Sequence, residues 1–599
     1  MRYITKKVVF AAGLALAFTS CSDFNDYNSV PTDTSNPKAD KTLLANIQEN
    51  ANLKDFVSII NKAKYAENLN ASQCYTLWAP LDGTYDASKI LALDSVKIVD
   101  RFINMHLAQF SHPVSGIVDE TIISLNDKHH SFTNLKGVLF DNLQIKDANI
   151  PSTNGLIHTI SGASEYHPNI YQYMDEVKGC DSLVMHVHQY DETYIDKKKS
   201  IEGPMVKGQQ TYLDTVLAKQ NTLIASIMKA DIQDEDSSYT VLFPTNDAWQ
   251  EAKDRIKPLY KYISPVNYMD VTTNNTPAAS LTATTAKSLN PVQIDADLYC
   301  DSLPKSQIMR NLSFSNSYIQ NKQLIDGASS DTDSLFSTNR TKLSNVSEIL
   351  SYCGELQPMS NGYTRTLSSL CFKPWETYET VHNNIEPVRM LGLKTGVPYT
   401  VNTYVKDTFV KEHWDKIKDL PDYVKTWIFD KNSGFFNYIS TDSINLQIAS
   451  SKPELDFALQ NVLSTKYHIF VVLVPSQVKE PERPVSDASN EIKNLYLRFD
   501  MSYTDADGTQ KYNRLNTPDA KKVSDDILVV NDGKFHVVEL EFTFPICYFG
   551  LQAYPTLFMS LTKSFTSTAN RRKFEQELRV AGVFLVPDDV YDYVKSLKF

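Results

Sequence analysis

Two stretches of the chain share one pattern of polar and apolar positions: a short apolar strand that a proline ends. Residues 239–249 read Tyr-Thr-Val-Leu-Phe-Pro-Thr-Asn-Asp-Ala-Trp, and the β-branched and aromatic run before Pro244 predicts a strand. Proline cannot donate to a sheet ladder, and Thr245 or Asn246 can cap a helix that follows it. Residues 74–82 (Cys-Tyr-Thr-Leu-Trp-Ala-Pro-Leu-Asp) repeat the pattern more loosely, so the sequence predicts a duplicated domain.

Apolar residues at helical spacing surround each copy. They predict helices over residues 41–64 and 96–107 in the first copy, and over residues 170–187 (two helices) and 213–228 in the second. Short strands are expected at 116–125 and around 138–145.

Each copy closes with an Asn-Gly pair and a strand, at residues 154–160 and 361–367. Pro80 to Asn154 spans 74 positions and Pro244 to Asn361 spans 117, an excess of 43. Residues 264–305, rich in Thr, Ser, Asn, Ala and Pro, are about that long, so they predict an inserted loop.

These stretches resemble the signature boxes of fasciclin domains. The first box reads roughly Tyr-Thr-Val-Phe-Ala-Pro-Thr-Asn-Asp-Ala-Phe. Residues 239–249 depart from it chiefly at Phe243, and the first copy has Leu81 and Asp82 where the family has threonine and asparagine. Residues 105–108 (Met-His-Leu-Ala) resemble the second box, which residues 307–320 replace in the second copy, and residues 154–160 (Asn-Gly-Leu-Ile-His-Thr-Ile) resemble the closing strand.

The resemblance implies two fasciclin-like domains, each a β-sandwich or wedge with helices. Their expected bounds are residues 41–168 and 169–382, with the insertion at about 264–305. His106 and His158 lie inside the boxes. In this family such residues mostly hold the fold, although contact with a ligand is the alternative.

From about residue 383 short strands and turns predict an all-β sandwich over residues 383–599, which makes the fold class α+β. Asp507-Gly508 and Asp532-Gly533 predict hairpin turns. At the level of fold this part resembles the jelly-roll modules of surface glycan-binding lipoproteins. The expected strands are 399–405, 435–439, 444–448, 467–474, 495–501, 535–544 and 580–586.

The amino terminus predicts export and lipidation. Residues 1–20 combine early positive charges with a short apolar run, which is typical of a signal peptide. Phe-Thr-Ser-Cys at the end of this run resembles a bacterial lipobox, in which Cys21 is lipidated. Residues 21–40 then predict a tether, with early acidic residues that resemble an export signal. We therefore expect a lipid-anchored protein of the outer membrane, exposed on the cell surface.

Charge and cysteine content exclude several classes. A net charge of -12 disfavours nucleic-acid binding. Apart from Cys21 the chain has six cysteines without a Cys-x-x-Cys pair, so no redox or zinc motif is present, and Cys353 with Cys371 is the candidate bridge. No cofactor motif appears.

Candidate chemistry is sparse. His186 and His188 lie two apart on an expected helix and face different directions, so we expect no metal site there. We expect His129 and His130 to be solvated in a polar loop, and residues 505–508 to form a turn rather than a calcium loop. Catalytic signatures are lacking, so we expect no enzyme.

Flat rings bind sugars by stacking, and five aromatic residues of the C-terminal part are candidates, although each is first expected in the core: Trp414, Trp427, Tyr438, Tyr548 and Tyr554. The sequence thus predicts an adhesion or binding protein. Its expected partner is a polysaccharide, or a TonB-dependent outer-membrane transporter complex that it serves as an accessory. The alternatives are a host-matrix or cell–cell adhesin, and a carbohydrate-active enzyme with an unrecognised site.

Overall fold

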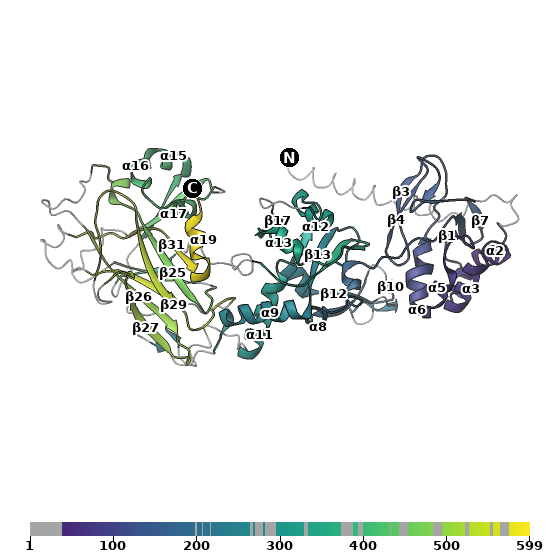
Figure 1. Ribbon diagram of the computed structural model, residues 1–599, viewed down its shortest axis with the longest axis horizontal. Helices are drawn as coiled ribbons and strands as arrows, with labels where there is room; N and C mark the ends of the chain where they lie inside the picture. The colour runs from purple at the N-terminus through teal and green to yellow at the C-terminus, as the bar shows by residue number, and fades with distance from the viewer. Residues whose placement is uncertain are drawn as a thin grey trace.

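The computed structural model contains three units in a row along its longest axis (Figure 1). The first unit runs from Leu43 to Ile160, the second from Ile170 to Leu367 and the C-terminal unit from Pro387 to Ser596. The structure describes residues 39–599 except for these segments: 198–199, 206–207, 216, 264–267, 270–279, 282–294, 329–333, 373–386, 393–398, 432, 442–452, 460, 483–493, 521–525, 551–554 and 563–573.

The first unit is built around a four-stranded sheet of order β2-β1-β8-β7, in which β1 and β8 are parallel. Helices cover one face, where Phe56 and Ile60 pack against Leu77 and Ile157. A second small sheet covers the other face through Trp78, whose ring stacks on Phe140 at 4.4 Å. The elements are α2 (Leu43–Glu49), α3 (Lys54–Ala63), α4 (Ala66–Asn70), β1 (Tyr75–Pro80), α5 (Ala87–Leu91), α6 (Ser95–Ile98), β2 (Leu107–Gln109), β3 (Asp119–Ile123), β4 (His129–Thr133), β5 (Leu139–Phe140), β6 (Leu143–Gln144), β7 (Ile150–Ser152) and β8 (Gly155–Ile160).

The second unit repeats the central sheet with the same register. In the first unit Tyr75 pairs with Gly155, and in the second Tyr239 pairs with Gly362, so the strand order β16-β13-β20-β19 matches that of the first unit. The elements are α7 (Ile170–Tyr173), α8 (Asp181–His188), β9 (Asp191–Ile195), β10 (Ile201–Glu202), β11 (Tyr212–Asp214), β12 (Leu217–Asn221), β13 (Tyr239–Pro244), α9 (Asn246–Ile256), β14 (Tyr268–Met269), β15 (Ser280–Leu281), α11 (Ala296–Met309), β16 (Ser313–Ser315), α12 (Gln323–Asp326), β17 (Leu335–Phe336), β18 (Lys342–Leu343), α13 (Val346–Ser351), β19 (Gln357–Met359) and β20 (Gly362–Leu367). The duplication predicted from the two strand-proline stretches is confirmed.

The asparagine of each Asn-Gly pair lies in the turn of a hairpin, and the glycine begins the strand that follows, where it meets a steric need. Gly155 has φ +150 and Gly362 has φ +136, and a Cβ on either would lie 1.9 Å from the carbonyl oxygen of Tyr75 or Tyr239. Only glycine lets the two parallel strands begin this close together. The predicted cap of α9 is confirmed, since the Thr245 hydroxyl accepts a hydrogen bond from the backbone of Ala248.

Three local predictions in these two units are wrong. Residues 213–228 are not one helix, because β12 pairs with β9 in a two-stranded ribbon before a π-helical turn at Ile224–Met228. The helix expected over 96–107 is α-helical only to Ile98, continues as a π turn at Val99–Ile103 and a 3-10 turn at Asn104–His106, and Leu107 already begins β2. The insertion at 264–305 ends in a helix, α11, rather than being a loop throughout.

The C-terminal unit is a two-sheet antiparallel sandwich, which confirms the predicted β-sandwich. One sheet has the order β21-β24-β30-β26-β27 with β28 beside β26, and the other has the order β22-β23-β31-β25-β29. Apolar residues from both, such as Phe499 and Val471, form the core between them. The strands are β21 (Pro387–Gly392), β22 (Tyr399–Val405), β23 (Phe435–Thr441), β24 (Pro453–Ala458), β25 (Lys466–Leu473), β26 (Leu495–Thr504), β27 (Gln510–Leu515), β28 (Ile527–Val529), β29 (His536–Thr543), β30 (Thr556–Leu561) and β31 (Arg579–Pro587).

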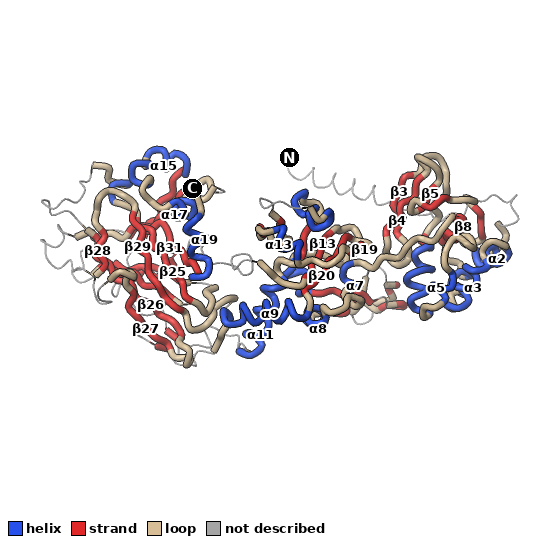
Figure 2. The backbone as a smooth tube through the Cα atoms, in the orientation of Figure 1, coloured by secondary structure: helices blue, strands red, loops and turns tan. Residues whose placement is uncertain are grey.

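This unit is not all-β, because four helices cover the outer face of the five-stranded sheet (Figure 2). They are α15 (Lys406–Glu412), α16 (Trp414–Ile417), α17 (Asp422–Ile428) and α19 (Tyr591–Ser596). Asp507-Gly508 closes the β26–β27 hairpin as predicted. Asp532-Gly533 does not make a hairpin, because β28 and β29 belong to different sheets. The strand expected at 444–448 lies outside the described residues.

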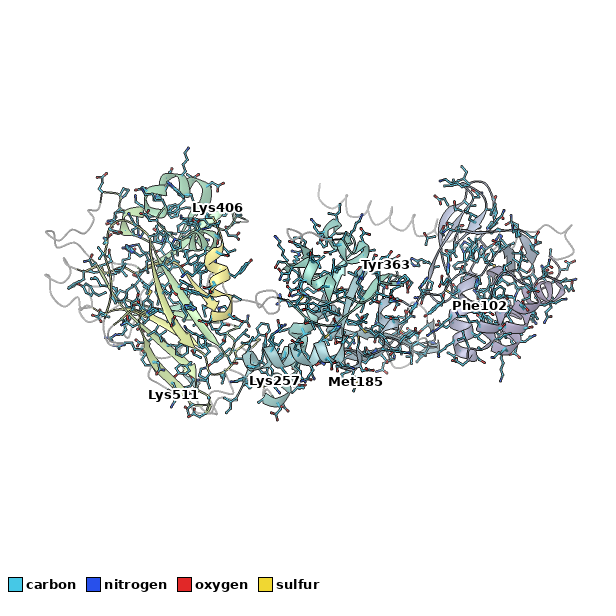
Figure 3. All side chains as sticks on the ribbon, viewed as in Figure 1. Phe102, Met185, Lys257, Tyr363, Lys406 and Lys511 are labelled. Carbon is cyan, nitrogen blue, oxygen red and sulfur yellow. The ribbon has the colours of Figure 1, made fainter. Side chains whose placement is uncertain are left out.

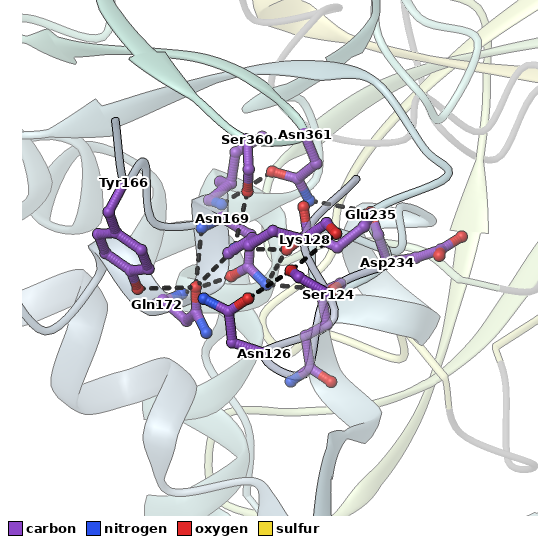
Figure 4. Close-up of polar contacts among 12 residues, drawn as sticks. Ser124, Asn126, Lys128, Tyr166, Asn169, Gln172, Asp234, Glu235, Ser360 and Asn361 are labelled. Atoms are coloured by element: carbon purple, nitrogen blue, oxygen red, sulfur yellow. Dashed lines mark hydrogen bonds and ion pairs between the residues drawn. The ribbon is translucent and has the colours of Figure 1, made fainter. Parts of the chain in front are cut away.

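Polar contacts join the first unit to the second (Figure 4). The Lys128 ammonium donates to Glu235 at 2.6 Å, to Ser360 at 2.9 Å and to Gln172 at 3.0 Å. Only 4% of the Lys128 side chain is exposed, and burial lowers its pKa. This buried ion pair fixes how the two units meet.

The insertion helix α11 contributes to the contact between the second unit and the sandwich. The Tyr299 hydroxyl donates to the carbonyl oxygen of Phe549 at 2.5 Å. Nearby, the Cys547 amide donates to Lys261 at 2.6 Å and the Ser464 amide donates to Leu259 at 2.8 Å. Lys257, labelled in Figure 3, begins the 3-10 turn Lys257–Tyr260 that follows α9 and leads to this contact.

Two further findings concern the cysteines and the length of the helices. None of the six described cysteines is in a disulfide, so the expected Cys353–Cys371 bridge is wrong. Among the described residues, no helix has the length and apolar character needed to cross a bilayer.

Candidate ligand-binding groove

A groove of about 700 Å³ lies on the helical side of the C-terminal unit. It opens between α15, α16 and the segment that follows α17, near Lys406 in Figure 3. Phe429, only 2% exposed, belongs to the apolar core beneath it. The lining residues are Lys406, Asp407, Val410, Lys411, Trp414, Phe429, Lys431 and Phe599.

Trp414 is the most exposed aromatic ring of the lining, with 45% of its surface accessible. The buried Lys425 ammonium lies 5.6 Å from the ring centroid, and Asp422 lies 3.3 Å from the same ammonium. A cation over an indole face is attracted by the ring quadrupole, so this contact holds the ring in place. The groove therefore presents an exposed aromatic ring in a fixed orientation.

Of the four sugar-binding candidates that the structure describes, Trp414 alone lines this groove. Tyr438 is 1% exposed and Tyr548 is 3% exposed, and the Tyr548 hydroxyl accepts a hydrogen bond from the Thr504 amide at 2.6 Å. Both rings belong to the core and have no face for a ligand. Trp427 is half-buried and stacks on Phe584 at 4.9 Å, while Tyr554 lies outside the described residues.

The sequence interpretation missed the lysines and Phe599 because it expected an all-β unit and no helices between the strands at 399–405 and 435–439. Ile417, Leu420, Val424 and Ile428 are buried in the segment from α16 to α17, and their spacings of three, four and four residues are typical of amphipathic helices. This spacing within residues 406–428 could have predicted the helices from the sequence. The contact of Phe599 with the groove depends on tertiary packing and has no local signal.

The candidate histidines are structural. The Nδ1–H of His106 donates to the Phe102 carbonyl at 2.7 Å, and its Nε2 accepts from the Ser164 amide at 3.0 Å. In His158, Nε2–H donates to the His112 carbonyl at 3.0 Å and Nδ1 accepts from the Asn149 amide at 3.4 Å. Burial lowers the pKa of each ring to about 4, so both are neutral.

His130 is not solvated as expected. It is 2% exposed in β4, where its ring contacts Asp141 and Ser124. His188 contacts Asp191 at 2.7 Å, whereas His186 stacks edge-on against Tyr190. Within the described part of the chain, no three His, Cys, Asp or Glu residues are grouped so that they could hold a metal ion.

Comparison with known proteins identifies one domain of the chain. No curated protein matches it in sequence. Among solved structures, a FAS1 domain pair from the insect cell adhesion molecule fasciclin I is 12% identical, covering 55% of this chain and 100% of that chain, with a TM-score of 0.19. The CBM22-1 xylan-binding domain from Paenibacillus barcinonensis Xyn10C is 10% identical, covering 34% of this chain and 91% of that chain, with a TM-score of 0.17.

Likenesses at these scores define neither a fold nor a ligand for this chain. The family model of the Fasciclin domain, by contrast, matches residues 51–163 directly. This range contains the strands β1 and β8 with their parallel register, together with the two structural histidines. Residues 51–163 of the chain are therefore a fasciclin domain.

Proposed function

We propose that this protein is a binding protein of the cell surface that holds a polysaccharide in the groove beside Trp414, without catalysis. The observation that carries the proposal is the exposed Trp414 ring, held over a groove of about 700 Å³ by the Lys425 ammonium. Sugar rings present C–H faces that pack on flat aromatic rings, and a held ring loses little conformational freedom on binding. A groove of this size accommodates a few sugar residues.

The test is a glycan array probed with the full chain. We expect binding by the unchanged protein and loss of binding in Trp414→Ala. Tyr318→Ala is the matched control, because Tyr318 is 47% exposed on the second unit, away from the groove. If both variants bind glycans as well as the unchanged protein does, the groove is not the binding site. Binding to matrix proteins in place of glycans would favour the adhesin alternative.

The remaining parts of the proposal concern location and assembly. We propose that lipid on Cys21 anchors the chain to the outer membrane, because residues 18–21 resemble a lipobox, and that residues 21–40 serve as a tether, because they are rich in small polar residues and contain two prolines. In this proposal the fasciclin-like domains span 41–168 and 169–382, and the protein assists a TonB-dependent polysaccharide importer. Cys21→Ser should move the protein from the membrane fraction to the soluble fraction, and co-purification with such a transporter tests the assembly.

A further inference from the structure

We infer that the groove selects an anionic polysaccharide, one whose sugars carry carboxylate or sulfate groups, and that Lys411 and Lys431 recognise the charge. This inference rests on the proposed function and adds the ligand class to it. It comes from the charges of the lining, which contains three lysines and one aspartate in a chain whose net charge is -12.

The three lysines are not equivalent. The Lys406 ammonium donates to the carbonyl oxygens of Asp430 at 2.8 Å and Lys431 at 3.4 Å, and its side chain is 13% exposed. Lys406 therefore ties α15 to the segment after α17 and is already satisfied. A ligand would leave this contact in place.

Lys411 and Lys431 are exposed on the groove. Lys411 lies near the end of α15, three positions before Trp414, and Lys431 follows α17. Among the residues that the structure describes, neither ammonium is in an ion pair or a hydrogen bond to another side chain. Both are therefore available to a charge on a sugar that stacks on Trp414.

The negative charge of the rest of the protein makes the groove more selective for a polyanion. A strongly acidic protein repels a polyanion over most of its surface, so a local excess of positive charge decides where such a polymer binds. The two lysines would act at long range as well as by contact, because exposed charges interact across about 10 Å at 0.1 M salt. A neutral glycan would gain only the stacking on Trp414.

The experiment compares matched ligands that differ only in charge. The probes are oligogalacturonides and their methyl esters, together with sulfated galactan oligosaccharides and the same oligosaccharides without sulfate. Binding to the full chain is measured by calorimetry at low and high salt. The variants are Lys411→Gln/Lys431→Gln, Lys411→Arg/Lys431→Arg, and the control Lys418→Gln/Lys479→Gln, which removes two exposed lysines of the same unit outside the groove.

We expect a charged probe to bind about tenfold or more tightly than its neutral counterpart, since each exposed ion pair contributes up to about a fivefold gain. Salt should weaken this preference. The glutamine double variant should lose it and keep its affinity for the neutral probe, whereas the arginine and control variants should retain it. Carboxylate and sulfate probes together show which anion is preferred.

Two results would overturn the inference and leave the proposed function intact. One is equal affinity for charged and neutral probes. The other is a charge preference that survives the loss of both lysines, which would place the recognition elsewhere. Absence of binding to any glycan would instead contradict the proposed function itself. Thermal unfolding of each variant serves as the control that the substitutions leave the fold unchanged.

Discussion

Asn154 and Asn361 make the same hydrogen bonds in the two fasciclin-like units. The side-chain carbonyl oxygen of Asn154 accepts a hydrogen bond from the backbone amide of Leu43 at 2.8 Å. The side-chain amide of Asn154 donates to the carbonyl oxygens of Leu69 and Ala71. Asn361 accepts from the Ile170 amide at 2.9 Å and donates to Ile232 and Asp234. Each asparagine thus joins the first helix of its unit to the turn before the central strand.

Asn361→Ala should therefore destabilise the second unit by about 2–4 kcal/mol, because buried backbone groups on two segments lose their partners. Urea unfolding combined with hydrogen exchange would show protection lost around Ile170 and Ile232 while the first unit stays protected. Asn154→Ala is the reciprocal control and should act on the first unit. Uniform loss of protection in both units would contradict this assignment.

The Lys128–Glu235 pair should control how the first two units are joined. Lys128→Met leaves the Glu235 carboxylate buried without its cation, which should cost about 3 kcal/mol. Small-angle X-ray scattering should then report a broader range of shapes. Changing both residues, to Met and Gln, should restore part of the stability, since no lone charge remains. If the single variant scatters like the unchanged protein, other contacts hold the junction.

Acid should weaken the first unit through His106 and His158. Each has a pKa of about 4 when folded and 6.5 when unfolded, so the unfolded chain binds more protons between these values. Their stabilising contribution is present above pH 6.5 and is lost as the pH falls towards 4, by up to roughly 3 kcal/mol each. Thermal unfolding at pH 7.5 and pH 5 measures this, and His106→Asn should reduce the dependence on pH.

Replacement by alanine should destabilise the protein much more at Trp427 than at Trp414. Trp427 packs on Phe584 and Phe470 between α17 and the sheet, so Trp427→Ala should lower stability by about 2–4 kcal/mol. Trp414 is 45% exposed, and its loss should change stability by less than about 1 kcal/mol. Chemical unfolding of the two variants distinguishes them, and a large loss in Trp414→Ala would contradict its assignment to the groove.

The features that could be predicted from the sequence were those with a local signal. The strands at Tyr75 and Tyr239 and the cap at Thr245 follow from proline chemistry, strand propensity and helix capping. Residues 213–228 misled the prediction because a partner strand at Asp191–Ile195, distant in sequence, outweighs helical spacing. His130 was misplaced for a similar reason, since its burial depends on Asp141 and Ser124.

The candidate site was only partly predictable. Trp414 was among the residues expected to stack on sugars, but the sequence gives no measure of exposure, so the buried Tyr438 and Tyr548 looked equally suitable. The lysines of the groove are brought together by three short helices that the expectation of an all-β unit excluded.

The contact made by Tyr299 affects the distance between the first unit and the groove of the C-terminal unit. Hydrogen bonds cross both junctions, from α11 to the sandwich and from Lys128 to the second unit, and the three units lie in a row along the longest axis (Figure 1). The end that begins at residue 39 and the groove therefore lie in different units, which these contacts connect. The spacing between them is set by contacts between folded units, and the loss of either set of contacts should change it.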